Sequence, residues 1–186
     1  MLPDLVFVHG YTASSQSDWY PAISPELIAL GVQFAIPDLP GGDFPQADEW
    51  VRHIGEAVTR SRQPVVLVGH SLGTRAVLLF LEKSGVSVDA VFLIAAFNNS
   101  VDNARRAEGR YASFFHHHLD LQQIRRQSKK WVVIHSTDDD SIPFAQGKQV
   151  ADELRARLIS PSRYGHFCDS SEAAFILSTI RSELSF

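Results

Sequence analysis

The amino-acid sequence predicts a three-layer α/β fold, in which a mostly parallel sheet of about six strands carries helices on both faces. Short apolar runs that are typical of strands alternate with helix-like stretches along the whole chain, and this alternation favours a doubly wound sheet. The runs at 64–71, 88–96 and 131–136 lack polar alternation, as expected of strands buried on both faces. A chain of 186 residues fits one domain with a sizeable core, so we expect a single compact domain over 1–186.

Apolar runs supply the expected strands. In chain order they are 5–10, 32–38, 64–71, 88–96, 131–136 and, more weakly, 157–160. Helices are expected between and after them. The segment QADEWVRHIGEAVTR (46–60) repeats apolar side chains at helical spacing, LGTRAVLLFLEKSG (72–85) ends on a glycine suited to a helix C-terminus, and SEAAFILSTIRSEL (171–184) carries an apolar stripe.

The longest stretch without an expected strand is 97–130, which follows the fourth strand. In open α/β sheets ligands bind beyond the carboxyl ends of the strands, so this stretch starts at the ligand-binding edge. It carries the aromatic residues Phe97, Tyr111, Phe114 and Phe115, whose rings could either line a substrate site or pack into the core beneath an ordinary helix. We expect a small, partly helical cap that leaves the pocket shallow and open.

The composition, with 45% hydrophobic and 20% charged residues, is that of an ordinary globular protein. A net charge of −4 and short, scattered basic pairs argue against a nucleic-acid partner. The single cysteine, Cys168, excludes an internal disulfide and fits a reducing compartment. The N-terminus lacks a positively charged leader, and no apolar run approaches the roughly 20 residues of a membrane span. The expected location is the cytoplasm, with no membrane partner.

The segment GHSLG (69–73) places Ser71 between two glycines, where an expected strand meets an expected helix. This is the G-x-S-x-G pattern of a nucleophile elbow, a strained turn that exposes a serine hydroxyl. The flanking glycines let the helix pack close to the strand. The alternative is a glycine-rich turn without a chemical role, because the pattern alone also arises by chance. The position between strand and helix favours a nucleophile.

A serine nucleophile needs a base, and the best candidate among the histidines is His166. It lies in RYGHFCDS, a turn-like segment between the last expected strand and the last expected helix. The other histidines fit less well. His70 would point into the sheet packing, His53 faces out of a helix and His135 lies within a strand. We therefore expect His166 to be the base.

The base in turn needs a carboxylate, and HSTDDDSIPF offers Asp138, Asp139 and Asp140 at the end of the fifth strand. Two of the three are expected to be solvated turn or helix-capping residues. With any of them the chain order is Ser, Asp, His, the order found in α/β-hydrolases. Oxyanion-hole donors are expected from the backbone amides of Tyr11, which ends the first strand in HGY, and Leu72. His9 is expected to be a structural hydrogen-bonding residue.

Over its whole length the chain resembles the small serine hydrolases of the retinoblastoma-binding protein nine family, a compact branch of the α/β-hydrolases, and we identify it as similar to a bacterial member. The segments HGYTASSQSDWYP, IPDLP, GHSLG, STDDDSIPF and YGHF come in that family's order and spacing. The resemblance implies a catalytic triad of Ser71, Asp139 and His166. Asp139 also lies four residues before Pro143, a spacing that the superfamily's acid usually keeps.

The resemblance does not extend to a retinoblastoma-type partner. The L-x-C-x-E motif of the animal member is absent, because the only cysteine is Cys168. The family's substrates are poorly defined, so the resemblance implies the chemistry rather than a particular substrate. We expect a small-molecule acyl substrate.

The leading hypothesis is a serine hydrolase of the carboxylesterase type that cleaves small esters, thioesters or amides without a metal or organic cofactor. A different class would be a non-catalytic protein-binding module on the same scaffold. A third would be metal-assisted hydrolysis by the run 116–118 (HHH) with Asp120, but consecutive histidines point in different directions. Cys168 lacks an elbow and is expected to be an ordinary small thiol.

Overall fold

The computed structural model describes residues 2–61, 64–99 and 107–186. Within them the strands form one parallel sheet in the order β2-β1-β3-β4-β5-β6. The strands are β1 (Asp4–Val8), β2 (Phe34–Ala35), β3 (Val65–His70), β4 (Val88–Ile94), β5 (Ser128–Ile134) and β6 (Arg157–Ile159). Since all of them run in the same direction, their carboxyl ends meet at one edge of the sheet.

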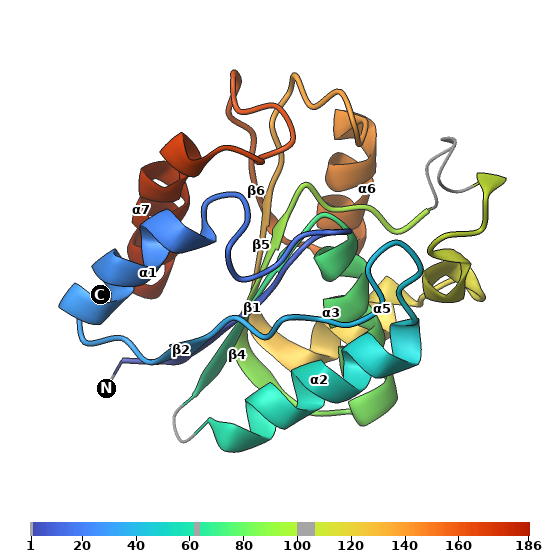
Figure 1. Cartoon of the computed structure of the whole chain (residues 1–186), viewed down its shortest axis with the longest axis horizontal. Helices are drawn as coiled ribbons and strands as arrows, with labels where there is room; N and C mark the ends of the chain where they lie inside the picture. The colour runs from blue at the N-terminus through green and yellow to red at the C-terminus, as the bar shows by residue number, and fades with distance from the viewer. Residues whose placement is uncertain (1, 62–63, 100–106) are drawn as a thin grey trace.

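Helices cover both faces of this sheet (Figure 1). On one face pack α2 (Ala47–Arg60), α3 (Leu72–Ser84), α5 (Leu121–Ile124) and α6 (Phe144–Leu154). The other face is covered by α1 (Tyr20–Ala29) and α7 (Ala173–Leu184). Each face has its own buried apolar cluster, and the sheet lies between the two. The predicted three-layer α/β architecture is confirmed.

Several elements differ from the sequence-based expectation. The strand expected at 32–38 is reduced to β2, because Pro37 lacks the N–H that a ladder needs. Helix α1 was not expected, since Pro21 and Pro25 obscure the pattern; burial of Ile23 and Leu27 against the sheet stabilises it. Helix α6 was also not expected. Among the described residues, no helix has the length and apolar character that crossing a membrane would require.

The segment 97–130 is described in two parts, and residues 100–106 of the expected cap lie outside the described residues. The described parts contain a short 3-10 helix (Ala112–Phe115), α5 and a second 3-10 turn (Arg125–Gln127).

The side chain of Arg75, in α3, binds the backbone of this segment. Its Nε donates to the carbonyl of Phe114 at 2.8 Å, Nη2 donates to that of His117 at 2.7 Å, and Nη1 donates to Asn98. The side chain is fully buried, and this burial lowers the pKa of Arg75 to about 10, which leaves it cationic at neutral pH. Arg75 therefore ties both described parts of the segment, 97–99 and 107–130, to α3.

A buried carboxyl at the start of α7 gives a prediction about stability. Glu172 accepts a hydrogen bond from the amide of Asp169 in a capping box. Burial, together with the nearby charges of Asp169 and Asp18, raises the pKa of Glu172 to about 7. At a pH between the ordinary pKa of a glutamate and this raised pKa, Glu172 keeps its proton in the folded chain and loses it in the unfolded chain. This group's contribution to stability therefore falls as the pH rises through that window.

Glu172→Gln should remove this loss while keeping the cap, because glutamine also serves in a capping box. We expect the variant to gain about 2 kcal/mol relative to the wild type between pH 5 and pH 8, measured by urea unfolding at both values. Glu26→Gln, at an exposed position on α1, is the control and should show no such change. An equal stability difference at both pH values for Glu172→Gln would contradict the prediction.

Candidate active site

Ser71 stands at the junction of β3 and α3, at the carboxyl edge of the sheet. Its backbone has φ 52° and ψ −122°, a left-handed conformation that is strained for a residue with a side chain. Its amide donates to the carbonyl of Ile94 at 2.9 Å, which ties the turn to β4. At Gly69 and Gly73 a Cβ would meet backbone atoms within 3.0 Å. The local structure is thus the tight, strained elbow that the GHSLG segment predicts.

The structure brings Ser71, His166 and Asp139 together in one chain of hydrogen bonds. The Nε2 atom of His166 lies 2.8 Å from the Oγ of Ser71, and its Nδ1 lies 2.9 Å from Oδ2 and 3.1 Å from Oδ1 of Asp139. The carboxylate accepts only, so Nδ1 carries the ring proton and Nε2 is free to accept the serine proton. The three residues follow β3, β5 and β6, whose carboxyl ends lie at the same edge of the sheet, with β4 between β3 and β5.

The other two aspartates of the run have different partners. Asp138 accepts from the Oγ of Ser136 at 2.5 Å and from the amide of Arg163 at 3.0 Å, so it fixes the loop after β6. Asp140 is exposed and lies 3.2 Å from the Oγ of Ser141. Neither is hydrogen-bonded to His166, so the geometry matches the register in the DDD run that the resemblance implies.

The carboxylate of Asp139 is fully buried and has several donors. The amides of Ser141 and Ile142 both donate to Oδ1 at 2.9 Å. Burial by itself would raise the pKa of Asp139, but hydrogen bonds from His135, His166 and the Ile142 amide outweigh it and hold the pKa well below its ordinary value. The group therefore stays ionised across the range in which proteins are assayed.

His135 is a functional candidate that the sequence reasoning missed. It was expected within the fifth strand, but it lies directly after β5 and is fully buried. Its Nε2 donates to the carbonyl of Ile142 at 3.0 Å and lies 3.3 Å from Oδ2 of Asp139. A Cβ at Gly147 would come within 2.0 Å of its Nδ1, so α6 packs directly on the ring. The signal that the sequence offered for this role was the position of His135 four residues before Asp139.

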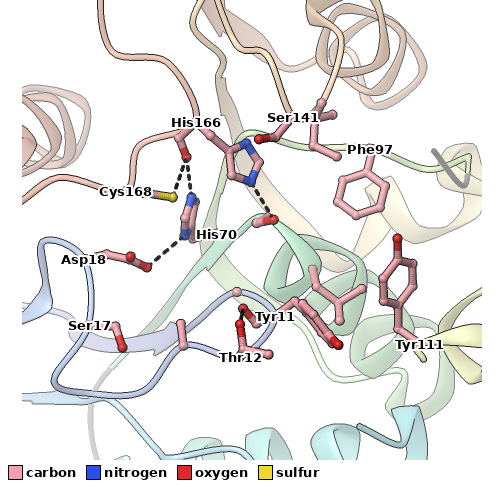
Figure 2. Close-up of a pocket in the computed structure, with 15 residues that line it drawn as sticks. Tyr11, Thr12, Ser17, Asp18, His70, Phe97, Tyr111, Ser141, His166 and Cys168 are labelled. Carbon is pink, nitrogen blue, oxygen red and sulfur yellow. Dashed lines mark hydrogen bonds and ion pairs between the residues drawn. The ribbon is translucent and has the colours of Figure 1, made fainter. Parts of the chain in front are cut away.

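His70 is buried, as expected, but it also lines a cavity, which was not expected (Figure 2). Its Nε2 donates to the backbone carbonyl of His166 at 2.8 Å. Burial, reinforced by the neighbouring His166, lowers the pKa of His70 to about 3, so the ring is neutral at physiological pH. His70 thus holds the main chain of the residue that contacts Ser71.

The cavity over Ser71 measures about 360 Å³ and is open to solvent. Tyr11 and Leu72, the two expected oxyanion donors, both line it. Leu72 is the first residue of α3, where an N–H has no partner within the helix. A Cβ at Gly10 would lie 3.2 Å from the Cβ of Ser71, so the chain after β1 runs past the serine. His9 binds this region structurally through Gly10 and Leu39.

The aromatic residues of the segment 97–130 divide between the two roles left open by the sequence. Phe97 and Tyr111 line the cavity, on the side away from Asp18 (Figure 2). Phe114 is fully buried against Trp50 in the core. Phe115 stacks on Phe97 and lies under the guanidinium of Arg75.

The remaining polar candidates take no part in the hydrogen-bonded chain of Ser71, His166 and Asp139. His117 pairs with Glu82 at 2.7 Å. In the described parts of the chain, no three His, Cys, Asp or Glu side chains gather as a metal site would require. Cys168 lines the cavity near the carbonyl of His166. Partial burial, helped by nearby carboxylates, raises the pKa of its thiol to about 11, which disfavours the nucleophilic thiolate.

Comparison with known proteins gives a consistent result. The family model described as serine hydrolase matches residues 5–174. The chain is 30% identical over 171 residues to a Bacillus subtilis (strain 168) protein named as a hydrolase, YdeN, with 91% of this chain and 88% of that protein covered. It is 25% identical over 151 residues to the serine hydrolase RBBP9 of Rattus norvegicus, with 80% and 77% covered.

Solved structures show the same relationship. The crystal structure of the B. subtilis ydeN gene product superposes with a TM-score of 0.87 at 28% identity, covering 99% of this chain and 100% of that one. Alpha/beta hydrolase domain-containing protein 10 from mouse superposes with a TM-score of 0.73 at 17% identity, covering 100% and 90%, a likeness of fold alone.

Proposed function

The chain belongs to the serine hydrolase family, and from this premise we propose that it cleaves small carboxylic esters, thioesters or amides through an acyl-enzyme on Ser71. The expected hydrolase class and the resemblance to the RBBP9 and YdeN type are confirmed by the family match and the relatives. The observation that carries the finer proposal is the continuous hydrogen-bonded chain from Ser71 through His166 to Asp139.

In the proposed reaction the Oγ of Ser71 attacks the substrate carbonyl while Nε2 of His166 takes the serine proton. The imidazolium so formed is stabilised by the Asp139 carboxylate, which also keeps the proton on Nδ1. The negative charge that develops on the carbonyl oxygen faces the backbone amides of Tyr11 and Leu72. His166 then gives its proton to the leaving group. Water hydrolyses the acyl-enzyme by the same steps, which returns the proton to Ser71.

Two further histidines act in this proposal as positioning residues. His135 places its Nε2 3.3 Å from Oδ2 of Asp139, the same oxygen that His166 contacts, and so helps to fix the rotamer of the carboxylate. His70 holds the backbone of His166. Because a triad works only within a narrow range of distances, both would influence the rate without touching the substrate.

The cavity supports a small acyl substrate. Its volume of about 360 Å³ lies at the low end of ligand pockets, and Phe97 and Tyr111 give it an apolar wall. We expect acetyl to butanoyl esters to be better substrates than palmitoyl esters, as the small size of the cap also indicates. A steady rise of kcat/KM with chain length, corrected for solubility, would overturn this expectation.

The test of the proposed function combines a covalent probe with an ester assay. A fluorophosphonate should label the wild type at Ser71, with loss of fluoride, and labelling and ester hydrolysis should both be lost in Ser71→Ala, because the Ser71 oxygen is the nucleophile in both reactions. Ser178→Ala, an exposed serine of α7, is the matched control and should react like the wild type. Folded wild type that neither labels nor hydrolyses any ester would favour the non-catalytic binding module instead.

A further inference from the structure

The side of the cavity opposite the aromatic wall is polar and carries a carboxylate. Figure 2 shows Asp18, Ser17 and Cys168 on one side and Phe97 and Tyr111 on the other, with His166 between them. The two sides thus differ in chemistry, and the aromatic side alone does not account for a substrate's polar groups.

Asp18 is held in this wall by a turn that suits its residue type. Its φ of 52° is left-handed, a conformation that aspartate and asparagine adopt more readily than most residues. The side chain is 16% exposed, and among the described residues no N–H or O–H donates a hydrogen bond to its carboxylate. Burial raises the pKa of Asp18, with His166 opposing the change. A carboxylate in this state would be stabilised by a cation.

A second hydrogen-bond acceptor lies beside the Asp18 carboxylate. Its Oδ2 lies 3.7 Å from Nδ1 of His70, too far for a hydrogen bond. Since Nε2 of His70 donates to the carbonyl of His166, the neutral ring leaves Nδ1 as an acceptor. That atom is buried and has no hydrogen-bond partner in the described part of the chain. The partly exposed carboxylate of Asp18 therefore faces a buried acceptor on the protein side, and not a donor.

We propose that the Asp18 carboxylate, which lies beside His70 in this wall, forms a subsite for a protonated amine of the substrate, so that the preferred substrates are acyl compounds carrying an ammonium group close to the scissile carbonyl. The ammonium would lie close to the carbonyl because Asp18 and Ser71 line the same cavity, and because the ring beside Asp18, that of His70, lies 5.3 Å from the ring of His166. An ammonium supplies both the hydrogen-bond donors and the positive charge that the Asp18 carboxylate lacks. This inference rests on the proposed function and adds a substrate class to it.

The test compares isosteric ester pairs that differ only in the cation. In the acyl pair, ethyl 3-aminopropanoate is compared with ethyl butanoate. In the leaving-group pair, 2-(dimethylamino)ethyl butanoate is compared with 3-methylbutyl butanoate. Hydrolysis is followed at neutral pH by titration of the released acid. We expect kcat/KM of the wild type to favour the cationic member of at least one pair by about tenfold or more, the size of one charge-assisted hydrogen bond.

Asp18→Asn keeps the left-handed turn and removes the charge, so the ratio of cationic to neutral kcat/KM should fall to about one. Asp48→Asn makes the same change of net charge on the exposed surface of α2 and should keep the wild-type ratio. Equal rates within both pairs for the wild type would overturn the inference while leaving the proposed function intact. So would an equal loss on both members in Asp18→Asn, which would show that Asp18 acts on His166. If no ester is hydrolysed, the proposed function fails and the inference fails with it.

Discussion

Asp139→Asn is expected to lower kcat/KM for esters by about 10⁴-fold, as the same change does in a serine protease triad. The structure gives the reason atom by atom. The amides of Ser141 and Ile142 donate to Oδ1, so an asparagine would place its carbonyl oxygen there and its NH₂ group at the position of Oδ2. That NH₂ would face Nδ1 of His166 and donate to it. The ring proton would then move to Nε2, where it blocks proton transfer from Ser71.

The control for this prediction is Asp140→Asn, which makes the same charge change at the exposed neighbour and should retain activity within about threefold. His135→Leu should give an intermediate loss, because it removes one donor from the carboxylate and leaves the His166 tautomer intact. Rates are compared by initial-rate kinetics on a short-chain ester, and folding is checked by circular dichroism. Near wild-type activity of folded Asp139→Asn would show that another group orients His166.

Gly73→Ala is expected to destabilise the protein by more than about 4 kcal/mol, a size reserved for mutations that force the backbone apart. A Cβ at Gly73 would lie 2.1 Å from the carbonyl oxygen of Val8 and 2.6 Å from that of His9. These are backbone atoms of β1 and of the residue after it. Because β1 pairs with β3 inside the sheet, these atoms cannot rotate away as a side chain can. Helix α3 would have to move away from the sheet.

The effect is measured as the change in the free energy of urea unfolding, or as loss of soluble protein. Gly85→Ala is the control, because a Cβ there meets nothing within 4 Å. It should cost only about 1 kcal/mol, for placing a side chain at a left-handed position. A Gly73→Ala protein as stable as the wild type would mean that α3 lies further from β1 than the structure has it.

Several strands, one helix and the elbow could be predicted from the sequence, because each depends on the pattern of residues that are close together in the chain. The buried strands β3, β4 and β5 are continuous apolar runs, and α2 shows its apolar face at helical spacing. The elbow at Ser71 needs only a strand, two glycines and a helix in succession. The order Ser71, Asp, His166, combined with parallel strands, brings the three functional groups to one edge of the sheet.

Less local features were predicted less well. Helix α1 carries prolines, and its stability comes from Ile23 and Leu27 packing on the sheet, which no local pattern shows. Strand β2 is shorter than its apolar run, with only two residues paired to β1, because Pro37 lacks the N–H that would continue the ladder. The DDD run was resolved by a family resemblance, since the three aspartates are chemically identical in sequence.

The sequence by itself therefore determined the sheet, the elbow and the kind of chemistry, whereas only the tertiary structure decided which groups surround that chemistry. His135 belongs to the site through its contact with Asp139, and His70 through its hydrogen bond to the backbone of His166. Asp18 belongs to it through its position beside His70. Such contacts join residues up to 96 positions apart. Local propensity acts over a few residues, and a buried polar side chain takes its role from the partner that packing places against it.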